Sequence, residues 1–407
     1  MTLHSDLKRV VEQREILSRA QARSLLDDVL AGSAVLAGSD EAAQSDSART
    51  LQLAALLGAI GARGETAAEL AGFADAMLSA AVAMPLSDAE RDQLVDTCGT
   101  GGDNTGTFNI STAAALVAAA AGATVAKHGN RAVTSKSGSA DVLEALGIPI
   151  NLSPADGAAS LRAHRFAFLH APSLHPAMKA VMPVRRALGV RTVFNVLGPL
   201  ANPAGARAQV MGVFSAHLMP IVAEAMRLLG TRHAFVVHGA VVHTDAAHGE
   251  LNSSANSELV EAANLSFDRS NNISTNLACP PNSGIDELSI SGASQVAEVR
   301  GDAVTYYQLT PEQVGLSRAP IESLRGGDAD ANAAILRAIF AGELGPRRDV
   351  VLLNAAAVLI ASGVVPTQTS DSHAAFRSAI VLAAHAIDSG AVAKLVAELA
   401  VDNLAAK

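Results

Sequence analysis

The stretch Asp96-Thr-Cys-Gly-Thr-Gly-Gly-Asp103, which continues through Asn104-Thr-Gly-Thr107 to Asn109-Ile-Ser-Thr112, decides the fold. Its glycines directly follow a short apolar segment that begins at Leu94. Glycine lets backbone amides approach an anion closely, because no Cβ stands in the way. An ordinary tight turn is the alternative, but a strand, a glycine-rich loop and a helix in succession are more typical of a phosphate loop in an α/β domain.

Two further signals follow within thirty residues, Lys127-His-Gly-Asn-Arg131 and Ser135-Lys-Ser-Gly-Ser-Ala-Asp141. Their basic side chains add charge, and nearby serines and threonines add hydroxyl donors. A site with this many donors suits a polyphosphorylated sugar better than a single phosphate. The residues that would supply charge or hydroxyls are Lys127, Arg131, Lys136, Ser111, Thr112 and Ser139.

The glycine spacing disfavours two common nucleotide-binding motifs. No Gly-Lys-Ser/Thr follows the glycines, so the stretch is not a P-loop. Asn104 occupies the third glycine position of a dinucleotide fingerprint, so a Rossmann dehydrogenase is disfavoured as well. We expect Ser111 and Thr112 to cap a helix that begins at Ala113, with free amides facing the anion.

The chain divides into two parts by pattern. Residues 1–94 read as a helical domain, with apolar residues at helical spacing and a capping box formed by Thr66 and Glu69. Residues 95–407 alternate short strands and helices, which predicts an α/β domain with a mostly parallel central sheet. Residues 240–284 are rich in Asn, Ser, Ala and Pro, and we expect a surface insertion with a short helix near Glu258–Ala263.

Composition excludes several classes of protein. The net charge of −9 argues against a nucleic-acid-binding protein, and with no Trp and two Tyr an aromatic stacking platform is not expected. Met1–Glu15 lacks the apolar core of a signal peptide, and the longest apolar run, Ala113–Ala126, is too short to span a bilayer. Two cysteines form no disulfide framework, which favours the cytoplasm.

One acidic pattern and one histidine pattern are possible metal sites. Asp286-Glu287, taken alone, is more typical of a solvated turn, but Mg²⁺ commonly accompanies pyrophosphate and takes one or two carboxylates. Histidines recur every five residues from His233 to His248, a spacing that places them on one face of neither a helix nor a strand. A zinc site there is disfavoured.

Taken together, the motifs GTGGD at 99–103, NIST at 109–112, KHGNR at 127–131 and SGSAD at 137–141 are highly specific, and HPAMKAVMPVRRALGVRTVFNVLGPLANPA at 175–204 adds to them. Over most of its length, the insertion excepted, the chain resembles the anthranilate phosphoribosyltransferases. Nucleoside phosphorylases share the architecture but typically carry Asp-Lys-Leu-Glu in the third signal, where this chain has Asp141-Val-Leu-Glu144. A non-catalytic, nucleic-acid-binding relative would be expected to lack the glycine loop and to carry a basic face.

The resemblance implies a nucleoside-phosphorylase-like fold and a homodimer formed through the helical domain, which helices within residues 174–206 would join. It implies transfer of phosphoribosyl from phosphoribosyl pyrophosphate to the amine of anthranilate in tryptophan biosynthesis, with two Mg²⁺ ions and no nucleic-acid or membrane partner. Members of the family typically run from the Val-Val-His-Gly strand almost directly into the acidic pair, whereas here residues 240–285 intervene.

The resemblance also implies roles by position. Lys127, His128 and Ser111 would be catalytic, although His128 is only a candidate general base. Ser111, Asp286 and Glu287 would hold Mg²⁺. Gly99, Asn130 and Arg185 would contact anthranilate, and Gly198-Pro199 would line its tunnel. The residues implied for phosphoribosyl pyrophosphate are Gly99, Gly102, Asp103, Thr107, Asn109, Ile110, Ser111, Thr112, Lys127, His128, Gly129, Asn130, Arg131, Ala132, Val133, Thr134, Ser135 and Ser139.

Overall fold

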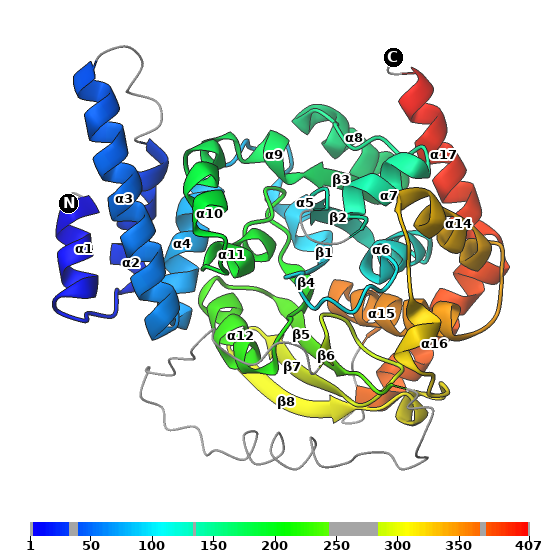
Figure 1. Ribbon diagram of the computed structural model, residues 1–407. Helices are drawn as coiled ribbons and strands as arrows, with labels where there is room; N and C mark the ends of the chain where they lie inside the picture. The colour runs from blue at the N-terminus through cyan, green and yellow to red at the C-terminus, as the bar shows by residue number, and fades with distance from the viewer. Residues whose placement is uncertain (1–2, 32–39, 133–135, 244–283, 367–371, 406–407) are drawn as a thin grey trace.

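The computed structural model describes residues 3–31, 40–132, 136–243, 284–366 and 372–405 (Figure 1). A group of helices lies at one end, the sheet with its covering helices forms the body, and the C-terminal helix lies at the opposite end. Most of the expected insertion, including the helix expected near Glu258–Ala263, lies outside the described residues, as do Val133, Thr134 and Ser135.

The N-terminal end is a helical bundle, as predicted. Its helices are α1 (Leu3–Val11), α2 (Arg19–Ala31), α3 (Asp40–Arg63) and α4 (Ala67–Ser79). Apolar residues at helical spacing in α3, such as Leu53, Leu56 and Ile60, are buried against the other helices. Helix α3 ends where Gly64 takes a left-handed φ of 88°.

The predicted capping box at the start of α4 is confirmed and is buried. The Thr66 side chain accepts from the Glu69 amide, and the Glu69 carboxylate accepts from the Thr66 amide. The same carboxylate accepts from the Leu17 amide at 3.0 Å and from Arg63 at 2.6 Å, and Glu69 is fully buried. One carboxylate therefore ties three segments of the bundle together.

We expect Glu69→Ala to lower the free energy of unfolding by about 3 kcal/mol, because it leaves the buried Leu17 amide and Arg63 without this carboxylate. The matched control is Glu90→Ala, which removes the same motif from the exposed box of Ser87 and Glu90. Urea denaturation of the two variants should give a much smaller loss for Glu90. Equal losses would show that burial of the Glu69 network contributes nothing.

The body contains one eight-stranded sheet with the order β3-β2-β1-β4-β5-β7-β8, and β6 pairs with β5. The pairs β3-β2, β2-β1, β1-β4 and β4-β5 are parallel, while β6, β7 and β8 join antiparallel. The expected mostly parallel sheet is therefore confirmed. The strands are β1 (Leu94–Gly99), β2 (Thr124–Gly129), β3 (Phe166–His170), β4 (Ala208–Gly212), β5 (His233–Ala240), β6 (Gly284–Ile285), β7 (Ser294–Arg300) and β8 (Ala303–Leu309).

Alternate residues of the central strands face two different cores. Val210, Phe235 and Val237 pack against α6 and α15, whereas Met211 and Val236 pack toward α12 and the bundle. Helices α6 and α15 are rich in alanine, which lets them pack closely on each other and on the sheet. The helices of the body are α5 (Asp88–Gln93), α6 (Ile110–Ala120), α7 (Ser139–Ala145), α8 (Pro154–His164), α12 (Met219–Leu228), α14 (Ala329–Phe340), α15 (Pro346–Ser362), α16 (Ser372–Asp388) and α17 (Ala391–Ala405).

A group of short helices connects the body with the bundle. Apolar side chains from this group, including Val184, Phe194 and Leu197, share one core with α2, α3 and α4. These elements fall within or next to residues 174–206, which were expected to join the helical part. They are α9 (Ala171–Leu174), the 3-10 helix η1 (Pro176–Ala180), α10 (Met182–Leu188) and α11 (Phe194–Leu200).

The two strands that flank the expected insertion lie side by side. Gly239 pairs with Ile285 and Ala240 with Gly284, so the chain leaves the sheet and returns to it at neighbouring points. The acidic pair follows β6 directly. Strand pairing therefore fixes where the chain returns to the sheet, one residue before the acidic pair, although residues 240–285 separate that pair from Gly239 in sequence.

No single helix in the described ranges is long and apolar enough to cross a membrane. Two consecutive helices, His373–Asp388 and Ala391–Val401, are together long and apolar enough, but they are bent by 60° relative to each other. This pair contributes Phe376, Ala379 and Leu395 to the core of the body.

Candidate active site

The glycine loop, residues Gly99–Thr107, leaves the carboxyl end of β1 at the centre of the sheet. Gly101, Gly102 and Gly106 have φ of 67°, 82° and 69°, and Asn104 has 57°. These left-handed conformations explain the glycine spacing, since a Cβ is strained there. Asp103 accepts from the backbone and hydroxyl of Thr105 and so fixes the turn.

Helix α6 begins at Ile110, three residues earlier than expected, and Asn109 is its N-cap residue. The prediction that Ser111 and Thr112 cap a helix starting at Ala113 is therefore wrong. The Asn109 side chain makes no cap bond, because it bonds instead to the Ser137 carbonyl and the Asn332 amide. These partners come from distant segments, so local pattern did not reveal them.

The first turn of α6 lies beside the acidic turn and Lys127. Ile110 and Thr112 are each 1% exposed, whereas Ser111 between them is less buried. The Ser111 hydroxyl is partly accessible and lies 3.5 Å from the Lys127 ammonium. The positive end of the helix dipole points in the same direction, which favours an anion.

Lys127 extends through the interior from β2 toward the glycine loop. Its ammonium donates to the Thr97 carbonyl at 2.6 Å, and the residue is 2% exposed. Its positive charge lowers the pKa values of Asp96 and Glu287 against the effect of burial. A buried ammonium at this position can stabilise charge on a bound diphosphate.

His128 follows Lys127 and is held neutral. Burial and the neighbouring His175 ring, 5.2 Å away, lower its pKa to about 3. Its Nδ1 lies 3.2 Å from the Gly198 carbonyl, which can only accept, so we assign the proton to Nδ1. The buried Nε2 has no hydrogen-bond partner in the described part of the chain.

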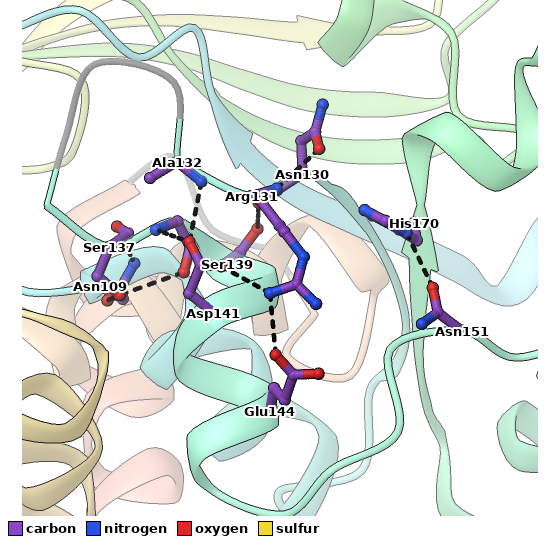
Figure 2. Close-up of polar contacts among 11 residues, drawn as sticks. Asn109, Asn130, Arg131, Ala132, Ser137, Ser139, Asp141, Glu144, Asn151 and His170 are labelled. Atoms are coloured by element: carbon purple, nitrogen blue, oxygen red, sulfur yellow. Dashed lines mark hydrogen bonds and ion pairs between the residues drawn. The ribbon is translucent and has the colours of Figure 1, made fainter.

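The third signal forms a compact cluster on α7 (Figure 2). Asp141 lies at its centre, and its Oδ2 accepts from the amides of Ala132 and Gly138 at 2.9 and 2.8 Å. The Arg131 guanidinium is bound to Asp141 and Glu144, each at 2.9 Å, rather than directed away from them. Asp141 thus joins the two ends of the segment 132–138, a role that the sequence analysis did not assign.

Asn130 and Ser139, which were both expected to contact a substrate, lie beside this cluster. Asn130 is exposed, and its side chain accepts from the Arg131 amide at 2.7 Å. The Ser139 hydroxyl lies 3.3 Å from the Asn130 carbonyl, and a Cβ on Gly129 would overlap that hydroxyl. His170 lies nearby and bonds to Asn151. The second and third signals therefore meet at the carboxyl ends of β2 and β3.

The acidic turn, which we define as Asp286–Leu288, lies against the glycine loop and α6. Asp286 accepts from the Gly101 amide at 2.7 Å, and Glu287 accepts from the Ser111 amide at 3.0 Å. Desolvation and the negative charge of Asp103 raise the pKa of Asp286 to about 7. Desolvation and the charge of Asp286 raise the pKa of Glu287 to about 8. The site therefore holds more negative charge than the positive side chains around it neutralise.

These carboxylates fit a magnesium ion by their chemistry. Carboxylate oxygens are hard ligands, and Mg²⁺ is commonly held by one or two of them together with water and phosphate oxygens. No group of three or more His, Cys, Asp or Glu side chains converges as a metal site within the described ranges. The two carboxylates thus offer a partial coordination sphere that a ligand with phosphate oxygens can complete.

Arg185 lies on α10, in the group of helices that connects body and bundle. Its guanidinium lies over the Phe194 ring, 5.5 Å from the centroid, and burial lowers its pKa. Its guanidinium donates to the Met182 sulfur at 3.9 Å, and it forms no ion pair with a carboxylate among the residues that the structure describes. A half-buried guanidinium without an anion is suited to bind a carboxylate.

The chain is similar to known proteins in sequence and in structure. Residues 91–274 and 253–393 match the family described as glycosyl transferase family, a/b domain, and residues 7–81 match glycosyl transferase family, helical bundle domain. Anthranilate phosphoribosyltransferase of Symbiobacterium thermophilum is 43% identical over 384 residues, 94% of this chain and 93% of the relative. The enzyme of that name from Chloroflexus aggregans is 43% identical over 392 residues, 96% and 95% of the two chains.

Solved structures agree with the sequence relatives. The crystal structure of anthranilate phosphoribosyltransferase from Thermus thermophilus has a TM-score of 0.76 at 36% identity, covering 98% of this chain and 99% of that one. The Saccharomyces cerevisiae enzyme, solved in complex with phosphoribosyl pyrophosphate and Mg, has a TM-score of 0.75 at 25% identity, covering 100% and 98%. The helical bundle and α/β body therefore match these neighbours in arrangement.

Proposed function

The chain belongs to the anthranilate phosphoribosyltransferase family, and on that premise we propose how its site works. The protein transfers 5-phosphoribosyl from phosphoribosyl pyrophosphate to the amine of anthranilate, giving N-(5-phosphoribosyl)anthranilate and pyrophosphate in tryptophan biosynthesis. The observation that carries the proposal is the meeting of three groups at the carboxyl ends of the central strands. They are the amides of the glycine loop, the buried Lys127 ammonium and the acidic turn.

The donor is proposed to lie over the glycine loop and the first turn of α6. Backbone amides and Lys127 face the diphosphate, while the segment after β2 surrounds the ribose phosphate. Support comes from the left-handed glycines, which bring amides to the surface, and from the end of the helix dipole. The segment that Asp141 ties together includes Arg131, Ala132 and, outside the described residues, Val133–Ser135.

In the reaction the bond between C1′ and the pyrophosphate oxygen breaks, and a bond between C1′ and the anthranilate nitrogen forms with inversion. The nitrogen then loses one of its two protons to solvent, which gives the neutral secondary amine. Negative charge develops on the departing diphosphate, so preorganised positive charge and hydrogen-bond donors are the main requirement. Lys127 and Ser111 are proposed to supply them. Ser111, Asp286 and Glu287 would hold Mg²⁺, in two ions, which when bound neutralises charge on the diphosphate.

His128 is proposed to position the amine rather than to remove its proton. A side chain with a pKa of about 3 is a weak base near neutral pH. Its unprotonated Nε2 can accept a hydrogen bond from the aniline nitrogen. Aniline is already a competent nucleophile, so orientation matters more than base strength.

The Arg185 guanidinium is proposed to bind the anthranilate carboxylate. Arg185→Ala should raise the KM for anthranilate about tenfold or more, because a charge-assisted hydrogen bond contributes roughly 1.5–3 kcal/mol. The KM for phosphoribosyl pyrophosphate should stay unchanged. Arg186→Ala, at the exposed neighbouring position, is the control. Loss of donor affinity with anthranilate affinity intact would remove this role.

Magnesium affinity should depend on pH. The pKa values of about 7 and 8 mean that Asp286 and Glu287 hold protons at pH 6 and have lost most of them above pH 8. A cation must displace those protons, so we expect Mg²⁺ to bind at least about tenfold more weakly at pH 6 than at pH 8, with proton release. Calorimetry in buffers of different ionisation enthalpy measures this release. Affinity that is flat over this range would contradict the role of the acidic turn.

Two rivals can be separated by one assay. A nucleoside phosphorylase would consume phosphate and thymidine, and a non-catalytic nucleic-acid-binding relative would turn over neither substrate pair. We expect pyrophosphate release only with phosphoribosyl pyrophosphate and anthranilate. Thymine release from thymidine and phosphate would instead favour the phosphorylase.

The protein is proposed to act as a homodimer in the cytoplasm. Two apolar side chains of the bundle are exposed, Leu51 by 71% and Val11 by 48%, and exposed apolar area supports association between copies. Cys98 is a free thiol, in keeping with a reducing compartment. Light scattering that returns the mass of one 41.4 kDa chain would contradict the dimer.

A further inference from the structure

The acidic turn, which carries the two carboxylates proposed to bind Mg²⁺, begins where the chain leaves the sheet. Strand β6 ends at Ile285, and the next strand, β7, begins only at Ser294. The backbone of residues 286–293 therefore lacks the ladder bonds that hold a strand in register. Buried backbone groups nevertheless require partners, so other parts of the chain must fix this segment.

One of these partners is Asn354, in the middle of α15 and 1% exposed. Its Oδ1 accepts from the Leu288 amide at 3.0 Å, and its Nδ2 donates to the Leu288 carbonyl at 2.9 Å. The same Nδ2 donates to the Val350 carbonyl within α15 at 2.9 Å. The side-chain amide thus replaces a neighbouring strand at the residue that follows Glu287.

The other side of the acidic turn rests on glycines at the ends of three adjacent strands. A Cβ on Gly212 of β4 would overlap the Asp286 carbonyl, and a Cβ on Gly99 of β1 would overlap the Asp286 carboxylate. A Cβ on Gly239 of β5 would lie 2.5 Å from the Glu287 carbonyl. The backbone of the turn is therefore in direct contact with the strand ends, with no room for a side chain between them.

Helix α15 also packs against α6, whose Ser111 amide bonds to the Glu287 carboxylate. The backbone contact at Leu288 and the carboxylate contact at Glu287 therefore come from two helices that pack together. Moving the turn away from α15 would break both its backbone bonds and the alignment of Glu287. Such outer contacts orient metal ligands and commonly change metal affinity by about 10–100-fold when removed.

We propose that Asn354 is a positioning residue. It holds the acidic turn against Gly99, Gly212 and Gly239 so that Asp286 and Glu287 can bind the cation. The inference rests on the proposed function, because it concerns the magnesium that accompanies the donor. Asn354 contacts neither carboxylate, and it acts only through the Leu288 backbone.

The test measures cation binding directly. Mn²⁺ is titrated into the full-length protein at saturating phosphoribosyl pyrophosphate and followed by electron paramagnetic resonance. Asn354→Leu keeps the side-chain volume but removes all three hydrogen bonds, and we expect the Kd for Mn²⁺ to rise about tenfold. The control is Val358→Ala, which creates a cavity one turn further along α15 and removes no hydrogen bond to the acidic turn. It should lower Tm and leave the Kd unchanged.

Asn354→Asp is the second variant, and it decides the question if the leucine variant does not fold. It keeps the acceptor for the Leu288 amide and loses both donated bonds, so its Kd should also rise. A Kd within twofold of the unmodified protein in a folded Asn354 variant would overturn the proposal, as would an equal rise for Val358→Ala. If the unmodified protein takes up no Mn²⁺ with the donor present, the proposed function itself fails.

Discussion

Replacing Lys127 with methionine should lower kcat/KM for phosphoribosyl pyrophosphate by about 10²–10³-fold, the cost typical of removing one preorganised donor to developing charge. Methionine keeps most of the buried aliphatic volume and removes the ammonium, which lies 2.6 Å from the Thr97 carbonyl and 3.5 Å from the Ser111 hydroxyl. The change deprives the departing diphosphate of its nearest buried positive charge. Steady-state kinetics with varied donor measures the effect.

The control for Lys127 is Lys394→Met, at an exposed lysine on α17 whose ammonium lies 3.8 Å from Glu398. It changes the net charge by the same amount at a distance from the site, so its kcat/KM should match the unmodified protein. A Lys127→Met protein that keeps kcat/KM within threefold of that control would remove the ammonium from the mechanism.

Replacing Asp286 with asparagine and Glu287 with glutamine together should lower Mg²⁺-dependent turnover by about 10³-fold or more, because both carboxylates proposed to hold the cation are lost. The amides keep the size of the side chains. They also remove a repulsion, since the pKa values of about 7 and 8 show that the folded protein disfavours two charges here.

The same variant gives a stability result that separates lost binding from lost folding. A carboxyl whose pKa is raised by folding costs stability as pH rises from about 4, its value in the unfolded chain, through its folded pKa. Without Mg²⁺ at pH 8, the double variant should therefore unfold at the same or a higher Tm. A folded variant with full Mg²⁺-dependent turnover would contradict the role of the acidic turn.

The sequence predicted the parts of the fold and of the site that depend on local backbone chemistry. The left-handed turns of the glycine loop require glycine, and the capping box of Thr66 and Glu69 follows from a spacing of three residues. The alternation of strands and helices predicted the mostly parallel sheet. In each case the physical requirement lies within a few residues of the motif that reveals it.

Features that depend on distant contacts were missed. Gly212 and Gly239 are ordinary strand residues by local pattern, and their need for glycine appears only because the acidic turn rests on them. Asn354 is a polar residue within an apolar helix, and its partner Leu288 is 66 residues away. The start of α6 was misplaced because Asn109 makes its side-chain bonds to Ser137 and Asn332 instead of to its own helix.

The most direct test of the whole account is calorimetric titration of the protein with phosphoribosyl pyrophosphate, with and without Mg²⁺. We expect one donor site per chain with Mg²⁺, weaker binding without it, and binding weakened further by Lys127→Met. Absence of any heat of binding from the unmodified, folded protein with Mg²⁺ present would contradict the claim that these strand ends hold a diphosphate ester.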